Sequence, residues 1–110
     1  MARNALGEME HLIMVAVLRL EEGAYGAAVI DEIESRAGRE VSHAAAYIAM
    51  QRLEAKGMLA GRTEEPETAR AGRARRFFSV TDTGLEKLRG SAAALFGIWK
   101  GVDPELRGKV

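Results

Sequence analysis

Apolar residues recur at helical spacing near the start of the chain, over residues 8–21. One face of this predicted helix carries Met9, Leu12, Ile13, Ala16 and Leu20. Met14, Val15 and Leu18 lie on the opposite side, so the helix is apolar almost all round, as is typical of a helix buried on two sides. We expect a second subunit to cover these three residues. The alternative is that the C-terminal helix of the same chain covers Met14 and Leu18.

Two further helices are predicted over residues 27–36 and from Ser42 to Lys56, where Gly57 ends the second of them. Ser42 is a good N-cap because its hydroxyl can accept from a backbone N–H of the first turn. The arc expected to pack inward holds Ala46, Ala49, Met50 and Leu53, and the outward arc holds His43, Ala44, Tyr47, Ile48 and Gln51. Small and apolar residues on an outward face indicate that a partner lies against it.

The rest of the pattern predicts a hairpin and one more helix. Two strand-like runs, residues 58–64 and 74–80, flank a loop rich in Glu, Pro, Gly and Arg. Thr81 then caps a helix to about residue 100. One face of that helix carries the stripe Leu85, Leu88, Ala92, Leu95, Phe96 and Trp99. Residues 101–110 are expected to be a flexible tail.

Composition fits one globular domain of 110 residues, 47% hydrophobic and 29% charged. The chain has no cysteine, which excludes disulfides and thiolate chemistry and fits a reducing cytoplasm. The N-terminus lacks the pattern of a signal peptide, and the longest apolar run is too short to span a membrane. We therefore expect a cytoplasmic protein.

The formal net charge is zero, but the charges are unevenly placed. Residues 1–40 carry eight acidic and four basic residues, whereas residues 41–110 carry eight acidic and twelve basic ones. The segment Arg70–Arg76 holds four arginines and no acid. A local basic patch is what phosphate binding requires.

Three helices followed by a basic hairpin form the plan of a winged helix-turn-helix: a mainly α fold with a β-hairpin wing, here followed by a C-terminal helix. In this plan the third helix enters the major groove of double-stranded DNA and the wing reaches phosphates or the minor groove. The candidate DNA-binding residues are Ser42, His43, Ala44, Tyr47, Ile48, Gln51, Arg52, Arg70, Arg73, Arg75 and Arg76. Arg73 and Arg75 are the favoured phosphate contacts.

Three blocks, residues 6–38, 41–62 and 72–88, resemble the PadR family of transcriptional regulators. The specific signal is a combination: Leu6-Gly7, Tyr25-Gly26, Tyr47 with Arg52-Leu53-Glu54 and Gly57, and the wing motif GRARRFF at residues 72–78. The resemblance implies a homodimer, usually a repressor, in which one helix after the wing serves dimerisation. Residues 1–80 would then be the DNA-binding domain and residues 81–100 the dimerisation helix.

The chain departs from the family pattern at three places. His43-Ala44-Ala45-Ala46 stands where the family often has Gly-Thr-Leu, and Ile48 stands where proline or threonine is common. Phenylalanines occupy positions 77 and 78, where tyrosines are usual. These departures fall on positions expected to contact bases and wing phosphates, and they leave the expected fold unchanged.

Several residues have two interpretations each. Tyr47 either contacts the DNA backbone or is a core aromatic. His43 either reaches a phosphate or base edge or is a solvated polar residue. Gln51 could read adenine through a bidentate pair, contact a phosphate, or be a bystander. Arg52 either contacts DNA or pairs with an acid such as Glu32, and Arg76 is a DNA contact or is partly tied into the fold.

The predicted dimer interface consists of Met14, Val15, Leu18, Leu88, Leu95, Phe96 and Trp99. Phe96 and Trp99 are core or interface residues by their chemistry. The resemblance adds a possible effector pocket, because related regulators can bind flat apolar or aromatic molecules at a dimer-interface pore near such aromatics.

An enzyme is disfavoured because the sequence has no nucleophile motif and no glycine-rich phosphate loop, and His11 and His43 are isolated. We expect no catalytic residue, no metal and no cofactor. The remaining alternative is a winged helix whose exposed face, with Ala44, Ala45 and Ile48, binds a protein and not DNA.

Overall fold

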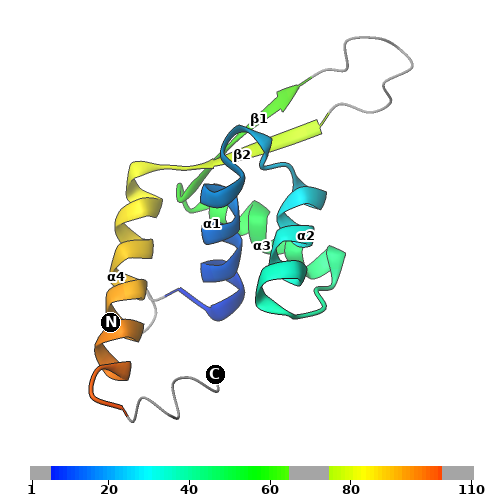
Figure 1. Cartoon of the computed structure of the whole chain (residues 1–110). Coiled ribbons are helices and arrows are strands. Elements are labelled where there is room, and N and C mark those ends of the chain that lie inside the picture. The colour runs from blue at the N-terminus through cyan, green and yellow to red at the C-terminus, as the bar shows by residue number, and fades with distance from the viewer. Residues whose placement is uncertain (1–5, 65–74, 103–110) are drawn as a thin grey trace.

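The computed structural model describes residues 6–64 and 75–102, which form a winged helix with four α-helices and a two-stranded hairpin (Figure 1). In chain order the elements are α1 (Glu8–Leu20), the short 3-10 helix η2 (Glu21–Gly23), α2 (Gly26–Ala37), α3 (His43–Ala55), β1 (Leu59–Glu64), β2 (Arg75–Val80) and α4 (Asp82–Trp99). The mainly helical fold with a hairpin wing is therefore confirmed, with element ends within about two residues of the predicted ones.

Both predicted N-caps form the expected hydrogen bonds. The Ser42 hydroxyl accepts from the backbone N–H of Ala45 at 3.2 Å, at the start of α3. The Thr81 hydroxyl accepts from the N–H of Gly84 at 3.0 Å, at the start of α4. Gly38 ends α2 with φ of 68°, a left-handed conformation that glycine adopts without steric cost. Local chemistry thus fixes where α3 and α4 begin and where α2 ends.

The hairpin is antiparallel, and its register runs from Leu59 opposite Val80 to Glu64 opposite Arg75. The segment before α2 is bound to the outer side of β2. The N–H of Phe78 donates to the carbonyl of Ala24 at 2.8 Å, and Tyr25 forms an isolated bridge with Phe77. The wing is therefore attached to the helical part through its base, and not only through its two chain ends.

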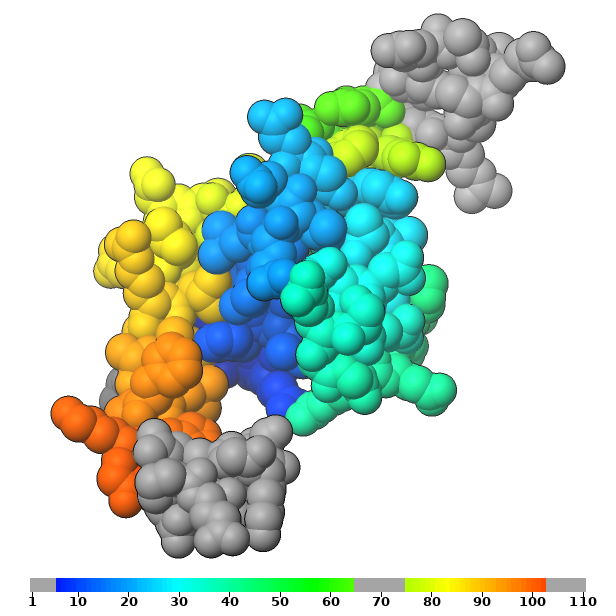
Figure 2. All heavy atoms as spheres, in the orientation of Figure 1, coloured from blue at the N-terminus to red at the C-terminus, as the bar shows by residue number. Residues whose placement is uncertain are grey.

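The core lies around α1, which packs against α2 and α3 on one side and α4 on the other (Figures 1 and 2). Its largest fully buried side chains come from every major element except β2 and α4: Ile13, Met14, Val29, Ile30, Met50, Leu53 and Leu59. Phe78 of β2 and Leu88 of α4 close this core from the remaining sides. Burial of these side chains is the main term that stabilises the fold.

Two residues of the predicted dimer interface belong to the core of the single chain. Met14 is fully buried and reaches the start of α4 at Gly84, and Leu88 is buried as well. The expectation that a partner covers them is therefore wrong, because α4 covers α1 here. Leu18, in contrast, stays 44% exposed, so α4 of the same chain does not cover it.

The C-terminal half of α4 leaves the core. Leu95 is 50% exposed, Phe96 75% and Ile98 76%, whereas Val15 and Trp99 are partly buried. Ile98 was missed in the sequence, although its spacing of three residues after Leu95 places it on the same side of a helix.

No helix among the described residues is both long and apolar enough to cross a membrane.

Candidate nucleic-acid interface

The outward face of α3 is exposed along its length. Ser42, His43, Ala44, Tyr47, Ile48, Gln51 and Arg52 are all solvent-exposed. On the inward face Ala46, Met50 and Leu53 are fully buried, and Ala49 is half-buried. The predicted division of α3 into two arcs is confirmed. The sequence-derived recognition residues thus share one surface, and Ile48, 49% exposed, is an uncovered apolar side chain on it.

The turn between α2 and α3 is fixed by the carboxylate of Glu34. This carboxylate accepts from the backbone N–H of Val41 at 3.0 Å, while the Val41 side chain is buried. With Gly38 on one side and the Ser42 cap on the other, the turn has little freedom. The outward face of α3 is therefore held at a set angle to α2.

Two acidic residues in the first turn of α1 form ion pairs with the α2–α3 turn and with the end of α3. Glu10 pairs with Lys56 at the end of α3 at 3.5 Å, and Glu8 pairs with Arg39 in the α2–α3 turn. The hydrogen bond and charge of Glu8 raise the pKa of Arg39 above its ordinary value. Exposed pairs of this kind contribute little stability. They do orient the side chains of Lys56 and Arg39 toward Glu10 and Glu8.

Tyr47 lies on α3 but packs against the start of α2. A Cβ at Gly26 would lie 2.2 Å from Cε1 of Tyr47 and 2.7 Å from its hydroxyl, so only glycine leaves room for the ring. The ring is nevertheless 41% exposed. The ring is therefore packed on one side, as the core interpretation expects, and exposed on the other, so its contact with the DNA backbone stays a prediction.

The wing arginines have different surroundings. Arg76 pairs with Glu54 of α3 and donates to the hydroxyl of Thr63 at 3.1 Å, which confirms that it is tied into the fold. Gly61 makes room for this pair, since a Cβ there would lie 2.6 Å from Nη2 of Arg76. Arg75 instead places its guanidinium over the ring of Tyr25, 4.5 Å from the centroid. Arg70 and Arg73 lie outside the described residues.

The suggested pair of Arg52 with Glu32 is wrong. Glu32 accepts from Arg19 of α1 at 2.7 Å and from Arg36 of its own helix at 3.2 Å. The hydrogen bond from Arg19, together with the charges of Arg19 and Arg36, holds the pKa of Glu32 below its ordinary value. Arg52 remains exposed on α3.

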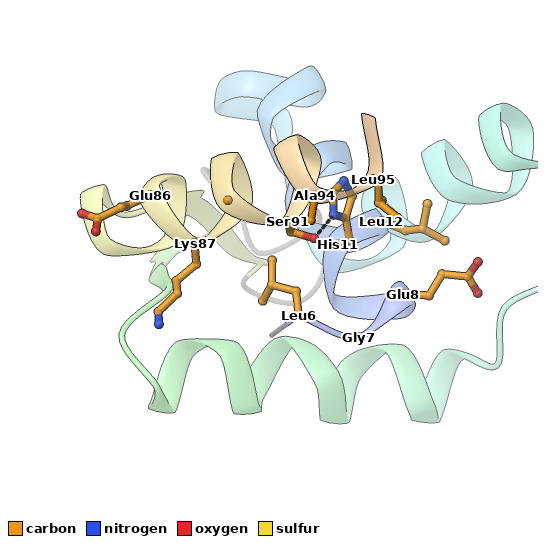
Figure 3. Close-up of a pocket in the computed structure, with 11 residues that line it drawn as sticks. Leu6, Gly7, Glu8, His11, Leu12, Glu86, Lys87, Ser91, Ala94 and Leu95 are labelled. Carbon is orange, nitrogen blue, oxygen red and sulfur yellow. Dashed lines mark hydrogen bonds between the residues drawn. The ribbon is translucent and has the colours of Figure 1, made fainter. Parts of the chain in front are cut away.

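A hollow of about 840 Å³ lies between the start of α1 and the middle of α4 (Figure 3). Nδ1 of His11 and the hydroxyl of Ser91, both lining the hollow, form a hydrogen bond of 2.8 Å. Leu6, Leu12 and Leu95 form apolar parts of its wall. Phe96 and Trp99, the expected effector-pocket residues, do not line this hollow. The described residues include no group of three or more metal-ligating side chains.

Comparison with known proteins points to one family. Residues 14–90 match the family model described as transcriptional regulator PadR-like. None of the curated proteins compared with the chain matches it.

Solved structures of similar fold agree. A PadR family transcription regulator from Clostridium difficile is 19% identical, with a TM-score of 0.74 over 86% of this chain and 93% of that one. A PadR family transcriptional regulator from Eggerthella lenta is 29% identical, with a TM-score of 0.66 over 83% of this chain and 77% of that one. Bacillus subtilis PadR, solved in complex with operator DNA, is 19% identical with a TM-score of 0.61, over 76% of this chain and 45% of that one.

Proposed function

The chain belongs to the PadR-like family of transcriptional regulators, and from that membership we propose that it is a homodimeric repressor of a palindromic operator in double-stranded DNA. The family comprises DNA-binding regulators and not enzymes. The repressor role, the dimer, the palindrome and the effector discussed below are our proposals for this chain.

The observation that carries the DNA proposal is the outward face of α3 beside the wing. Along that face the exposed residues are small, apolar or uncharged apart from Arg52, and Arg75 stands next to it on β2. Such a face can contact the edges of bases in the major groove. Ala44 or Ile48 can contact thymine methyl groups, and the amide of Gln51 can both donate and accept hydrogen bonds. With three alanines at positions 44–46, few side chains can form bidentate base contacts, so we expect moderate specificity, partly from DNA shape.

The test compares operator DNA with random DNA. Fragments of the promoters flanking the gene are screened by gel shift at low salt, and the bound site is then compared with a scrambled duplex. The double variant His43→Ala and Gln51→Ala should lose operator affinity much more than random-DNA affinity, because base contacts specify and phosphate contacts do not.

Two other outcomes would refute parts of the proposal. Equal loss on both duplexes would mean that these residues contact only the backbone. No binding of the wild-type protein to any duplex would favour the alternative, a protein-binding winged helix, for which the exposed Ile48 is the supporting observation.

The proposed dimer uses α1 and α4, with residues 81–100 as the dimerisation helix and residues 1–80 as the DNA-binding domain. It is supported by Leu18, Leu95 and Phe96, large apolar side chains that are exposed in the single chain. Val15 and Trp99 are partly exposed and belong to the same proposal. In a helix-turn-helix dimer the two recognition helices meet half-sites about 34–36 Å apart, which is why we expect a palindrome.

The dimer is tested by light scattering at micromolar concentration. Phe96→Ser should give a monomer that stays folded, because Phe96 is 75% exposed in the chain alone. Arg89→Ser, also exposed on α4, is the matched control and should remain dimeric. A monomeric wild-type protein would end this part of the proposal.

We place the effector, a flat aromatic molecule, against Phe96 and Trp99 between two copies. The support is the family resemblance and the exposure of Phe96. Trp99 is the single tryptophan of the chain, so its fluorescence reports on this place directly. A panel of small planar aromatic compounds should include one that quenches Trp99 and releases operator DNA. Unchanged fluorescence and unchanged DNA binding across the panel would argue against an effector here.

A further inference from the structure

Four side chains at the base of the wing form a row of contacts, with an arginine at each end and two aromatic rings between them. The guanidinium of Arg62 lies over the ring of Phe77, 4.7 Å from its centroid. The Phe77 ring meets Tyr25 edge-on, with centroids 5.5 Å apart and planes at 63°. Arg75 lies over Tyr25 at 4.5 Å. Cation–π contacts and edge-to-face ring pairs are both attractive, so each favours the observed position of its side chains.

Tyr25 is the member of this row that does not belong to the hairpin. It stands immediately before α2, and its backbone is bridged to Phe77. The adjacent hydrogen bond from Phe78 to Ala24 holds the same segment to β2. The guanidinium of Arg75 therefore contacts a residue of the helical part, which gives it a defined place relative to α2.

Arg75 also differs from its neighbours in charge balance. Arg76 is paired with Glu54, and Arg62 is paired with Glu64 while donating to the carbonyl of Glu22. Arg75 has no acidic partner among residues 6–64 and 75–102. Of the arginines of β1 and β2, it is the one whose positive charge is not offset within these residues.

The same arginine lines a hollow of about 630 Å³ between the start of α2, α3 and β2. Tyr25, Tyr47 and Gln51 line it as well, together with the ion pair of Arg76 and Glu54, in which the acid is already matched by a cation. A guanidinium over an aromatic ring is engaged through its face, which leaves the N–H groups in its plane free to donate. Those N–H groups match phosphate oxygens.

We propose that this hollow holds one backbone phosphate of the DNA, with Arg75 as the cation, the hydroxyl of Tyr47 as a second donor, and Tyr25 as the residue that positions Arg75. The proposal rests on the DNA-binding function proposed above and assigns to Tyr25 a role in it. The contact of Arg75 with the Tyr25 ring, which itself meets Phe77 of β2, is the observation that supports this role.

The experiment measures duplex affinity by fluorescence anisotropy over a series of KCl concentrations. Arg75→Gln should make the slope of log K against log salt shallower by about 0.9 and lower affinity about eightfold at 0.1 M salt, as expected for one lost phosphate contact. Arg89→Gln removes the same charge from α4 and is the matched control, which should keep the wild-type slope.

Tyr25 is tested by removing its ring. Tyr25→Phe keeps the ring and should bind as the wild type does. Tyr25→Leu should reproduce the loss seen in Arg75→Gln, and the double variant should be no weaker than either, because both changes remove one contact. A purely structural role would instead make the two losses additive. Should Tyr25→Leu fail to fold, the comparison of Arg75→Gln with Arg89→Gln decides the proposal.

The outcomes separate this proposal from the function on which it rests. Wild-type binding with an unchanged slope in Arg75→Gln overturns the phosphate site and leaves DNA binding standing. Additive losses overturn the positioning role of Tyr25. A wild-type protein that binds no duplex at low salt overturns both.

Discussion

At Gly84 the start of α4 packs directly against the backbone of Met58. A Cβ built there would lie 2.1 Å from the carbonyl oxygen of Met58 and 3.1 Å from Cε of Met14. The Met58 carbonyl already accepts from the N–H of Thr81 at 3.1 Å, and the Thr81 hydroxyl donates to the carbonyl of Gly57 at 2.6 Å. A methyl group therefore meets backbone that is fixed by two hydrogen bonds, so Gly84→Ala should force the start of α4 away from the strand.

The magnitude follows from two opposing terms. Overpacking a filled site costs about 1–3 kcal/mol, and contact with a backbone atom places this site at the upper end. Replacing glycine by alanine in a helix returns at most about 1 kcal/mol through propensity. We expect Gly84→Ala to lower the free energy of unfolding by about 2 kcal/mol.

The assay is urea unfolding followed by circular dichroism, at one protein concentration because a dimer's stability depends on it. Gly90→Ala is the matched control in the same helix, since a Cβ there would meet nothing within 4 Å. That variant should be more stable than the wild type by about 0.5–1 kcal/mol. If Gly84→Ala were as stable as the wild type, the close packing of α4 on Met58 would be refuted.

Three further predictions concern the helical part. Gly26→Ala should displace the Tyr47 ring, which can move toward solvent because it is partly exposed. DNA binding should therefore weaken while thermal stability changes little. A lower melting temperature with unchanged DNA binding would contradict this. Glu32→Gln should lower the melting temperature at neutral pH. Because the folded pKa of Glu32 is lowered, the difference should fade as the pH falls below the ordinary pKa of 4.5 and through the lowered one. A difference that persisted in acid would exclude the ion pair as its cause. Leu53→Ala removes a fully buried side chain and should cost about 2–5 kcal/mol by chemical denaturation, whereas Ala55→Gly on the exposed side should cost about 1 kcal/mol or less.

The division of α3 into a buried and an exposed arc was predictable from the sequence. Helical periodicity assigns Met50 and Leu53 to one side and Tyr47 and Gln51 to the other, whatever the helix packs against. The caps Ser42 and Thr81 were equally predictable, because an N-cap hydrogen bond is made within four residues of chain. Periodicity, caps and the family motifs together fixed the winged helix and the candidate recognition face.

The partner of each buried or charged side chain was decided by the tertiary structure. Helical periodicity predicts that Met14 lies on an apolar face. Whether α4 or another subunit covers that face depends on how the helices cross. Arg75 and Arg76 are adjacent and chemically identical, yet Arg76 pairs with Glu54 and Arg75 lies over Tyr25, because neighbouring residues of a strand point to opposite faces. Glu54 and Tyr25 are distant in sequence from these arginines, and such contacts arise only once strand and helices are packed. The sequence by itself determined the elements and their faces, and the packing of those elements determined which arginine of β2 has no acidic partner among the described residues.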